Sequence, residues 1–441
     1  MKKKAQIGKS YFIVTYGCSF NSGDSLKIQN ILEKNGYVKT SVENAQLIII
    51  NTCAVKNSTH TKIIDYIKKT RGQFPLKKIL ITGCLPFIGS EIYLEIQDII
   101  GKSGNILHPH DISKLILSIE DNIQENTIDS KNVNSNRDKS FLCPLYDDNS
   151  INIKSIPIQI SEGCNNECSY CCTTHARGNL FSFSNEGIIS QIEHFVKLGI
   201  KEFYLTSQDL GNYNYQNFKL HDLLNQISMI KGNFKIRLGM LNLDYLVKYI
   251  ELFLPIFEDK RFYRFLHIPI QSGNDRILHK MKRKYNIDEM KEIIDKIQKY
   301  DPKITFATDI IVGFPTETPE EHQDSLNFIN EWKPNNLNIS KYSARPNTEA
   351  KKMHQLSSQV IKSRSREFTS LYQSYKENIL KKWIGWEGEI LITEQHIGKD
   401  FPFTGRNLYN IPILSKNGVI GEKRDIVIIG TLNNSLIGEI K

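Results

Sequence analysis

The stretch Ser161 to Gly178, SEGCNNECSYCCTTHARG, sets three cysteines in the spacing C-x3-C-x2-C, at Cys164, Cys168 and Cys171. An apolar run over residues 156–160 precedes it and predicts a short buried strand. Cysteine thiolates hold iron–sulfur clusters, and three of them on one loop can ligate three irons of a four-iron cubane. The fourth iron then has no cysteine and stays open to another ligand. We therefore expect an open 4Fe-4S cluster on this loop.

A structural zinc site is the alternative for the same loop. Such sites usually close a tetrahedron with two cysteine pairs or with added histidines, and only His175 stands close by in the sequence. The open ligand set and the soft thiolates favour iron–sulfur. Cys172 directly follows Cys171. Since neighbours in an extended loop point in opposite directions, we expect Cys172 to be a spectator, with competition as a ligand as the alternative.

The bulk composition is that of an ordinary globular protein. The 441 residues are enough for about three domains, and 40% of them are hydrophobic and 24% charged. No apolar run approaches the roughly 20 residues that a membrane span needs, and the N-terminus does not favour a secretory signal. Eight cysteines in a chain of this length fit a reducing compartment better than a disulfide framework. We expect a cytoplasmic protein without a membrane partner. The net charge of +9 is modest, so its distribution matters more than its sum.

The first part of the chain repeats one pattern three times. A strand-like run is followed within one to three residues by a cysteine and then by a helical segment, and the cysteines are Cys18, Cys53 and Cys84. Strands that alternate with helices predict βαβ units and a parallel sheet, in which ligands collect at the carboxyl ends of the strands. One such cysteine is often just a small buried hydrophobe, but three in matching positions favour a second open cluster.

Several segments of the sequence resemble a known family. The C-x3-C-x2-C loop resembles the radical S-adenosylmethionine (SAM) superfamily, in which the open iron chelates SAM. The segments TYGCSFNSGDS, INTCAVKNST and ITGCLP ahead of it look like the methylthiotransferase family. The resemblance implies a flavodoxin-like N-terminal domain in which Cys18, Cys53 and Cys84 carry an auxiliary 4Fe-4S cluster. It also implies that the open iron of that cluster holds the sulfur to be donated.

Four regions follow from composition and pattern. Residues 119–150 are rich in Asn, Asp and Ser, which predicts a linker, and Cys143 within it is expected to be a plain thiol. The next part contains six strand-like runs separated by helical patterns, which fits a partial parallel (β/α)6 barrel with its site at the carboxyl ends of the strands. The expected regions are the N-terminal methylthiotransferase domain 1–118, the linker 119–150, the radical SAM domain 151–382 with a basic helical segment at its end, and an RNA-binding domain 383–441.

Polar residues near the predicted strand ends are the candidates for binding SAM. A lone residue there is more often a cap or a turn former than a ligand, and Gly313 alone could simply permit a tight turn. Taken together, the segments resemble those that face SAM in the superfamily. The resemblance implies cofactor contacts for Tyr170, Ser207, Asp209, Arg237, Met240, Gln271, Asp309 and Gly313.

Basic residues gather late in the chain. Residues 341–382 hold ten Lys or Arg against three acids, which favours a polyanion footprint over the alternative of a solvated helical face. About five short strand-like runs after residue 385 predict a small β-barrel that resembles the TRAM domain of tRNA-modifying methylthiotransferases. Aromatic residues there, such as Phe401 and Phe403, are either base-stacking groups or barrel core. The candidate RNA contacts are His175, Arg177, Arg283, Arg364, Arg366 and Arg406.

The subgroup rests on several segments, among them CSYCCTTHARGNL, LTSQDLGNY, HIPIQSGND and ATDIIVGFPTET. They resemble the archaeal and eukaryotic enzymes that methylthiolate N6-threonylcarbamoyladenosine at position 37 of tRNA, beside the anticodon. The resemblance implies ANN-decoding tRNA as the substrate, two 4Fe-4S clusters and SAM as cofactors, an electron donor and a sulfur source. No catalytic side chain is expected beyond cluster-bound SAM, because inserting sulfur at an unactivated ring C–H needs a cofactor-derived radical.

Other functions stay open at this point. One alternative is the same chemistry on isopentenyladenosine tRNA or on a ribosomal protein. Another, of a different class, is an iron–sulfur RNA-binding protein without turnover. The N-terminal cysteine trio speaks against the latter, because binding alone does not need two open clusters.

Overall fold

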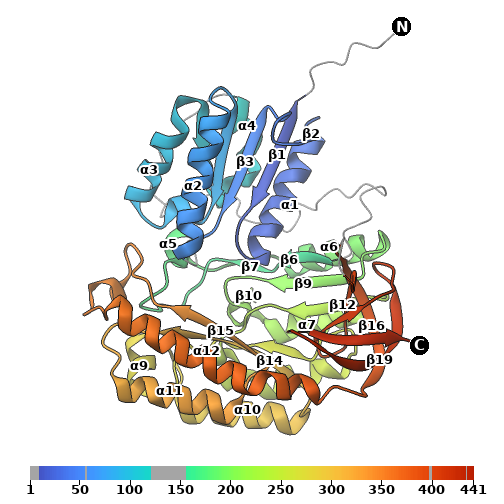
Figure 1. The fold of residues 1–441 in the computed structure, drawn as a ribbon. Coiled ribbons are helices and arrows are strands. Elements are labelled where there is room, and N and C mark those ends of the chain that lie inside the picture. The colour runs from blue at the N-terminus through green and yellow to red at the C-terminus, as the bar shows by residue number, and fades with distance from the viewer. Residues whose placement is uncertain (1–8, 55–56, 121–154, 397–399, 434) are drawn as a thin grey trace.

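The computed structural model describes residues 9–54, 57–120, 155–396, 400–433 and 435–441. Residues 121–150 of the expected linker, with Cys143, lie outside this part of the chain. Three bodies follow each other along the sequence: a layered α/β domain, a half-barrel with outer helices, and a small closed barrel (Figure 1). In the part of the chain that the structure describes, no helix has the length and apolar character needed to cross a membrane.

The N-terminal domain is a parallel sheet with helices on both faces. Its strand order is β2-β1-β3-β4-β5, the flavodoxin-like order, so the predicted fold class is confirmed. The central strand β3 is buried along its whole length, as expected when helices cover both faces. The strands are β1 Ser10–Thr15, β2 Val38–Lys39, β3 Leu47–Thr52, β4 Lys78–Gly83 and β5 Gly104–Ile106. Helices α1 Ser19–Lys34 and α4 Leu115–Glu120 pack on one face, and α2 Asn57–Gln73 and α3 Ser90–Ile100 on the other.

The central domain is the expected partial barrel, built from two three-stranded parallel sheets. Their strand orders are β12-β9-β6 and β13-β14-β15. Isolated parallel bridges, Ile236 with Phe262 and Met240 with His267, join the two sheets into one curved array of six strands. The strands are β6 Ser155–Gln159, β9 Glu202–Thr206, β12 Lys235–Leu238, β13 Phe265–His267, β14 Thr305–Val312 and β15 Asn336–Lys341. The outer helices include α6 Asn185–Lys197, α7 Leu220–Met229, α8 Leu243–Phe253, α10 Ile287–Tyr300 and α11 Pro319–Trp332.

Two strands end earlier than their apolar patterns suggest. The sequence predicts strands to residues 241 and 270, but β12 ends at Leu238 and β13 at His267. At Gly239, where β12 has ended, a Cβ atom would stand 2.7 Å from the Leu205 carbonyl oxygen, so the backbone there runs too close to β9 for a side chain. Pro269 has no N–H to donate to a ladder. Both departures place irregular backbone at the mouth of the half-barrel.

The C-terminal part begins with the long helix α12 Ser358–Lys381, which packs along the half-barrel and leads into a closed five-stranded barrel (Figure 1). The barrel order is β16-β17-β18-β20-β19, as expected for a TRAM-like domain. The barrel docks on the amino ends of two central strands, where Arg264 N donates to Leu408 O at 2.8 Å and Thr305 Oγ1 to Tyr409 O at 2.6 Å. The strands are β16 Glu387–Gln395, β17 Phe403–Arg406, β18 Pro412–Ser415, β19 Lys423–Leu432 and β20 Ser435–Ile440.

Candidate functional site

The loop with Cys164, Cys168 and Cys171 runs from the short strand β7 Ser161–Glu162 to the short helix α5 Thr173–Arg177. Its base is tied by a hydrogen bond of 3.3 Å from Cys164 N to Gly178 O. Backbone amides of the loop itself point at sulfur: Asn166 N donates to Cys164 Sγ and Thr173 N to Cys171 Sγ, each at 3.4 Å. The local chain thus supplies one backbone donor to each of two of the three thiols.

Side chains from other elements complete this set of donors. Asn212 Nδ2 lies 3.2 Å from Cys164 Sγ, and Arg283 Nη1 lies 3.4 Å from Cys168 Sγ. Burial raises the pKa of the Cys164 thiol to about 12, and the neighbouring thiols act in the same direction. A buried thiol of this kind becomes a thiolate when a metal coordinates it. Hydrogen bonds to sulfur are also among the features that tune iron–sulfur clusters, so this donor set fits the expected cofactor.

The spacing of the thiols is not that of a single-ion site. Within the described ranges, no group of three or more His, Cys, Asp or Glu side chains is arranged to hold one metal ion. A cubane takes one thiolate on each iron, so its ligands stand further apart than those around one zinc ion. Cys172 is buried in the apolar cluster of the N-terminal domain, with its Sγ 3.9 Å from the carbonyl oxygen of Ala54, and its spectator role stays a prediction.

The second trio lies at the carboxyl ends of three neighbouring strands. Cys18 is the N-cap of α1 just after β1, Cys53 follows β3, and Cys84 follows β4. Burial raises the pKa of the Cys84 thiol to about 11, and Cys53 and Cys18 are close enough to raise it further. The sheet therefore brings together three thiols that are far apart in the sequence, as the repeated strand–cysteine pattern predicts.

Two glycines allow these loops to approach each other. Gly17 has φ +111°, and a Cβ atom there would stand 2.7 Å from Cys53 Cβ and 2.9 Å from its Sγ. Gly83 has φ +90°, and its Cβ atom would stand 2.3 Å from the carbonyl oxygen of Thr52. Each glycine directly precedes a cysteine of the trio. Any side chain at either position would force apart the loops that carry the thiols.

Arg177, an expected RNA contact, instead lies between the two trios. Its side chain is fully buried, its Nε is 3.2 Å from Cys84 Sγ, and its Nη1 pairs with Asp24 and Glu162. No RNA phosphate can reach the guanidinium in this arrangement. Sequence reasoning placed Arg177 on the surface because nothing local shows that its partners come from the N-terminal domain.

Several SAM candidates present polar atoms without a protein partner. In the described part of the chain, the buried Ser207 Oγ and Arg237 Nε have no hydrogen-bond partner. Gln271 has φ +69°, an uncommon conformation for a residue other than glycine, and sits on a bridge to Ile310. Met240 lies on the bridge to His267 across the seam of the half-barrel. The Ser207 hydroxyl and the strained backbone of Gln271, both at the mouth of the half-barrel, suit a polar ligand such as SAM. The Arg237 guanidinium instead stacks on protein rings, with its Cζ 5.1 Å from the ring centroid of Tyr204 and 4.9 Å from that of Phe265.

Other candidates are engaged by the protein itself. The carboxylate of Asp209 accepts hydrogen bonds from Asn166 Nδ2 at 2.9 Å, Gly211 N at 3.0 Å and Asn242 N at 3.0 Å, so it ties the cysteine loop to the strand ends. Burial raises the pKa of Asp209 despite these donors. Asp309 Oδ2 bonds His267 Nε2 at 2.8 Å. Both carboxylates already accept hydrogen bonds from protein groups, so fewer of their lone pairs are available to a cofactor.

Two further candidates pack against protein neighbours. Gly313 has φ +72°, and a Cβ atom on it would stand 2.6 Å from Ile361 Cγ1 on α12. The close approach that this glycine permits is therefore to a helix. Tyr170 packs into a small apolar cluster around Met281 and Phe314. Its pKa is raised by burial, with Arg283 acting in the opposite direction.

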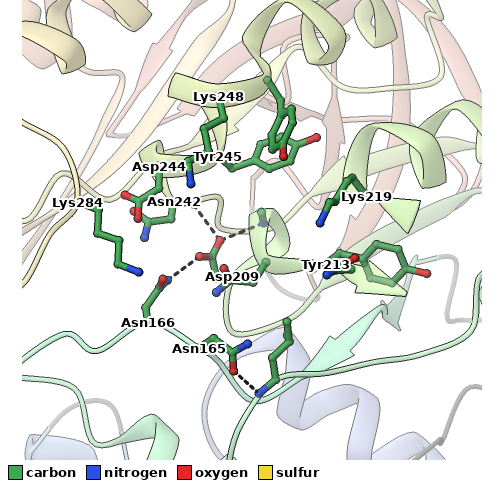
Figure 2. Close-up of a pocket in the computed structure, with 15 residues that line it drawn as sticks. Asn165, Asn166, Asp209, Tyr213, Lys219, Asn242, Asp244, Tyr245, Lys248 and Lys284 are labelled. Carbon is green, nitrogen blue, oxygen red and sulfur yellow. Dashed lines mark hydrogen bonds between the residues drawn. The ribbon is translucent and has the colours of Figure 1, made fainter. Parts of the chain in front are cut away.

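A pocket of about 260 Å³ opens beside the cysteine loop (Figure 2). Asn165 and Asn166 of the loop form one wall, and Asp209 lies at its centre. Three lysines from separate elements also line it: Lys219, Lys248 and Lys284. Sequence reasoning missed these lysines and Asn212. No local pattern indicates them, because Lys248 lies on α8 and Lys219 and Lys284 lie on separate segments that only the tertiary fold brings to one pocket.

The remaining RNA candidates differ in exposure. Arg366 on α12 is exposed, and His175 is half-buried with its Nε2 3.2 Å from Asn347 O. Arg364 is buried and paired with Glu317. Arg406 pairs with Glu394, and its pKa is raised by Tyr204 and Glu202 of the half-barrel although burial opposes this. Of the candidates, Arg366 is thus the arginine placed best for a phosphate.

Comparison with known proteins agrees with this geometry. A family model described as the radical SAM superfamily matches residues 158–329, and one described as uncharacterized protein family UPF0004 matches residues 10–99. Among solved structures, the cobalamin-dependent SAM radical enzyme OxsB gives a TM-score of 0.55 at 12% identity, covering 83% of this chain and 56% of OxsB. The radical SAM methyltransferase TsrM from Kitasatospora setae gives 0.56 at 11% identity, covering 78% and 77%. At this identity the likeness concerns the fold alone.

Curated relatives match over almost the whole chain. The probable threonylcarbamoyladenosine tRNA methylthiotransferase of Methanothermobacter thermautotrophicus is 33% identical over 433 residues, covering 98% of this chain and all of the relative. The protein of that name from Archaeoglobus fulgidus is 33% identical, covering 97% and 98%. The human threonylcarbamoyladenosine tRNA methylthiotransferase is 32% identical, covering 92% and 69%. The chain therefore belongs to the threonylcarbamoyladenosine tRNA methylthiotransferase family of radical SAM proteins.

Proposed function

We propose that this protein converts N6-threonylcarbamoyladenosine at position 37 of ANN-decoding tRNA to its 2-methylthio derivative. The observation that carries the proposal is the pair of cysteine trios, one at the carboxyl ends of each parallel sheet, with helix α5 between them. The names of the relatives support the substrate. An electron donor and a sulfur source are required as partners, and the cytoplasm is the proposed location.

Membership in the radical SAM superfamily implies one 4Fe-4S cluster and SAM. Cys164, Cys168 and Cys171 would hold that cluster, with Ser207, Met240 and Gln271 as the proposed SAM contacts. We assign a second 4Fe-4S cluster to Cys18, Cys53 and Cys84. When bound, these groups supply the radical and sulfur chemistry that an unactivated ring C–H demands and that no amino acid side chain provides.

The protein's own residues position these groups. Asp209 fixes the cysteine loop against the strand ends through Asn166, while Gly17 and Gly83 keep the second trio compact. Holding reactants in the correct geometry accounts for a large share of enzymatic rate enhancement. The exposed bases of α12 and the C-terminal barrel would hold the tRNA. We propose domain limits of 1–118, 151–382 and 383–441 for these roles.

Nucleoside mass spectrometry of tRNA tests the reaction and the substrate together. The chain is expressed in a host that makes threonylcarbamoyladenosine but does not methylthiolate it. We expect a 2-methylthio-N6-threonylcarbamoyladenosine peak that disappears when Cys164, Cys168 and Cys171 are replaced with Ala. No peak despite two assembled clusters would overturn the substrate assignment, and isopentenyladenosine tRNA and ribosomal protein would be assayed next.

A second experiment separates the roles of the two trios. Replacing Cys18, Cys53 and Cys84 with Ala should preserve SAM cleavage under reducing conditions and abolish methylthiolation. A well-folded triple variant that has lost both activities would contradict this division of labour. A parent protein that binds RNA and cleaves no SAM would instead support a non-catalytic iron–sulfur RNA-binding protein.

A further inference from the structure

We propose that Arg177 is a positioning residue that fastens the N-terminal cysteine trio to the radical SAM loop and raises the reduction potential of the cluster bound by Cys18, Cys53 and Cys84. The proposal rests on the second cluster assigned above. It gives a role to a buried arginine that the reaction as described leaves unused.

The guanidinium of Arg177 contacts a ligand of the trio directly. Its Nε donates to Cys84 Sγ at 3.2 Å, and its Cζ lies 4.9 Å from the ring centroid of Phe20. The side chain is 0% exposed, so water screens its charge far less than that of a surface arginine. Hydrogen bonds to cluster sulfurs, together with burial and net charge, set the potentials of iron–sulfur clusters.

Through Asn21, the same guanidinium is also connected to the chain segments that carry the other two cysteines. Arg177 Nη2 donates to Asn21 Oδ1 at 2.9 Å. Asn21 Nδ2 in turn donates to Tyr16 O at 2.9 Å and to Thr52 O at 2.7 Å. Tyr16 stands two residues before Cys18, and Thr52 directly precedes Cys53. A single side chain thus braces all three segments that carry the trio.

The backbone of Arg177 belongs to the other trio's loop. Arg177 ends α5, six residues after Cys171, and the next residue, Gly178, accepts the hydrogen bond from Cys164 N. The carbonyl oxygen of Arg177 lies 2.9 Å from His110 Nε2 of the N-terminal domain. Main chain and side chain together therefore join the two cysteine sites across the domain boundary.

The charges around the guanidinium predict the direction in which each variant should shift the reduction potential. Asp24 Oδ2 lies 2.7 Å and Glu162 Oε1 2.6 Å from Arg177 Nη1, both with buried side chains. A reduced cluster carries one more negative charge than the oxidised one, so a nearby cation stabilises it and a nearby carboxylate destabilises it. Removing Arg177 should lower the potential, whereas removing the charge of Asp24 should raise it.

A comparable contact is made to the radical SAM loop by an arginine from elsewhere in the half-barrel. Arg283 Nη1 lies 3.4 Å from Cys168 Sγ, and its Nε donates to Tyr285 Oη at 3.0 Å. Each trio therefore has one arginine on one of its sulfurs. Because Arg177 and Arg283 contact different trios, their effects should separate in one experiment.

The test is a redox titration of the full-length, anaerobically reconstituted protein, followed by electron paramagnetic resonance. Addition of SAM identifies the radical SAM cluster, because the open iron of that cluster is the one expected to bind SAM. The variants are Arg177→Met, Arg177→Lys, Asp24→Asn and Arg283→Met. Arg364→Met is the matched control, since it removes an arginine from a buried pair with Glu317, which does not contact either trio.

We expect Arg177→Met to shift the auxiliary potential downward, Arg177→Lys to shift it less, and Asp24→Asn to shift it upward. Arg283→Met should move only the SAM-sensitive cluster, and Arg364→Met neither. If Arg177→Met lowers cluster occupancy, Arg177→Lys and Asp24→Asn still give the sign. If Arg177→Met and Asp24→Asn shift the auxiliary potential in the same direction, or if neither variant shifts it, the proposal is overturned. If the wild-type protein contains only enough iron for one 4Fe-4S cluster, the assignment of the second cluster is itself refuted.

Discussion

Gly17 lies so close to Cys53 that a Cβ atom on residue 17 would stand 2.7 Å from the Cβ of Cys53. Separations under 3 Å between such atoms force one of the groups to move. Both loops carry ligands of the proposed auxiliary cluster. Assembly of that cluster should therefore depend on the absence of a side chain at residue 17.

Replacing Gly17 with Ala should reduce assembly of the auxiliary cluster and spare the one on Cys164, Cys168 and Cys171. Iron and sulfide analysis would then give about half of the parent values, because one of two similar clusters is lost. Gly36→Ala is the control, since Gly36 also has positive φ (+81°) but no atom within 4 Å of the added Cβ. Full cluster loading in the Gly17 variant would show that the loops can separate freely.

Replacing Ser207 with Ala should weaken SAM binding without destabilising the fold. The buried Ser207 Oγ has no protein partner among the described residues, so a bound ligand is what its hydroxyl would serve. Loss of one hydrogen bond costs about 1 kcal/mol, or roughly a fivefold rise in Kd. Calorimetry with SAM measures this, and Ser228→Ala on α7 is the control, since that hydroxyl already donates to Asn225 O. An unchanged Kd would remove Ser207 from the SAM site.

Replacing Lys351, Lys352, Lys362 and Arg366 with Gln should weaken tRNA binding and flatten its salt dependence. These residues are exposed on α12 and on the turn before it. For every phosphate that is no longer neutralised, the slope of log K against log salt should become shallower by roughly 0.7 to 0.9. Filter binding across a salt series measures the slope.

A control set removes four charges from a different surface, on α10 and just after it: Lys291, Lys296, Lys299 and Lys303. These substitutions should leave the slope unaltered, because the proposed footprint does not include α10. An equal effect of both sets would point to non-specific attraction.

Stability should fall as the pH drops through the range in which His322 titrates. Burial lowers the pKa of His322 in the folded protein, although Glu367 acts in the opposite direction. The unfolded chain then binds more protons near its ordinary pKa of about 6.5, so acid favours unfolding. The stabilising contribution is present above that value and is lost below it. Thermal unfolding at several pH values should give a shallower dependence for His322→Gln than for the parent protein.

The sequence was most informative where function depends on position along a strand. Cysteines one to three residues past three strands had to converge once the sheet was parallel, and the half-barrel followed from six alternating units. It was least informative for arginines. Arg177 and Asp24 are 153 residues apart, and Arg283 and Cys168 are 115 apart, so no local pattern could show that these side chains turn inward.

Gly313 shows the same limit of prediction from the sequence. Gly313 ends a strand at the position where a backbone approach to a ligand was one interpretation, yet its close neighbour is Ile361 of α12. That contact depends on how a helix almost fifty residues later packs against the half-barrel. Residue type indicated the need for space, and only the tertiary arrangement showed what fills that space.

The docking of the C-terminal barrel has a consequence for how this protein can be dissected. The carbonyl oxygens of Leu408 and Tyr409 satisfy Arg264 and Thr305 at the entrance of two central strands. A truncation at α12 would remove those two acceptors and uncover the bottom of the half-barrel. Deleting the domain is thus a perturbation of folding before it is a test of RNA binding. Point substitutions on its outer surface are the sounder means of mapping what it recognises.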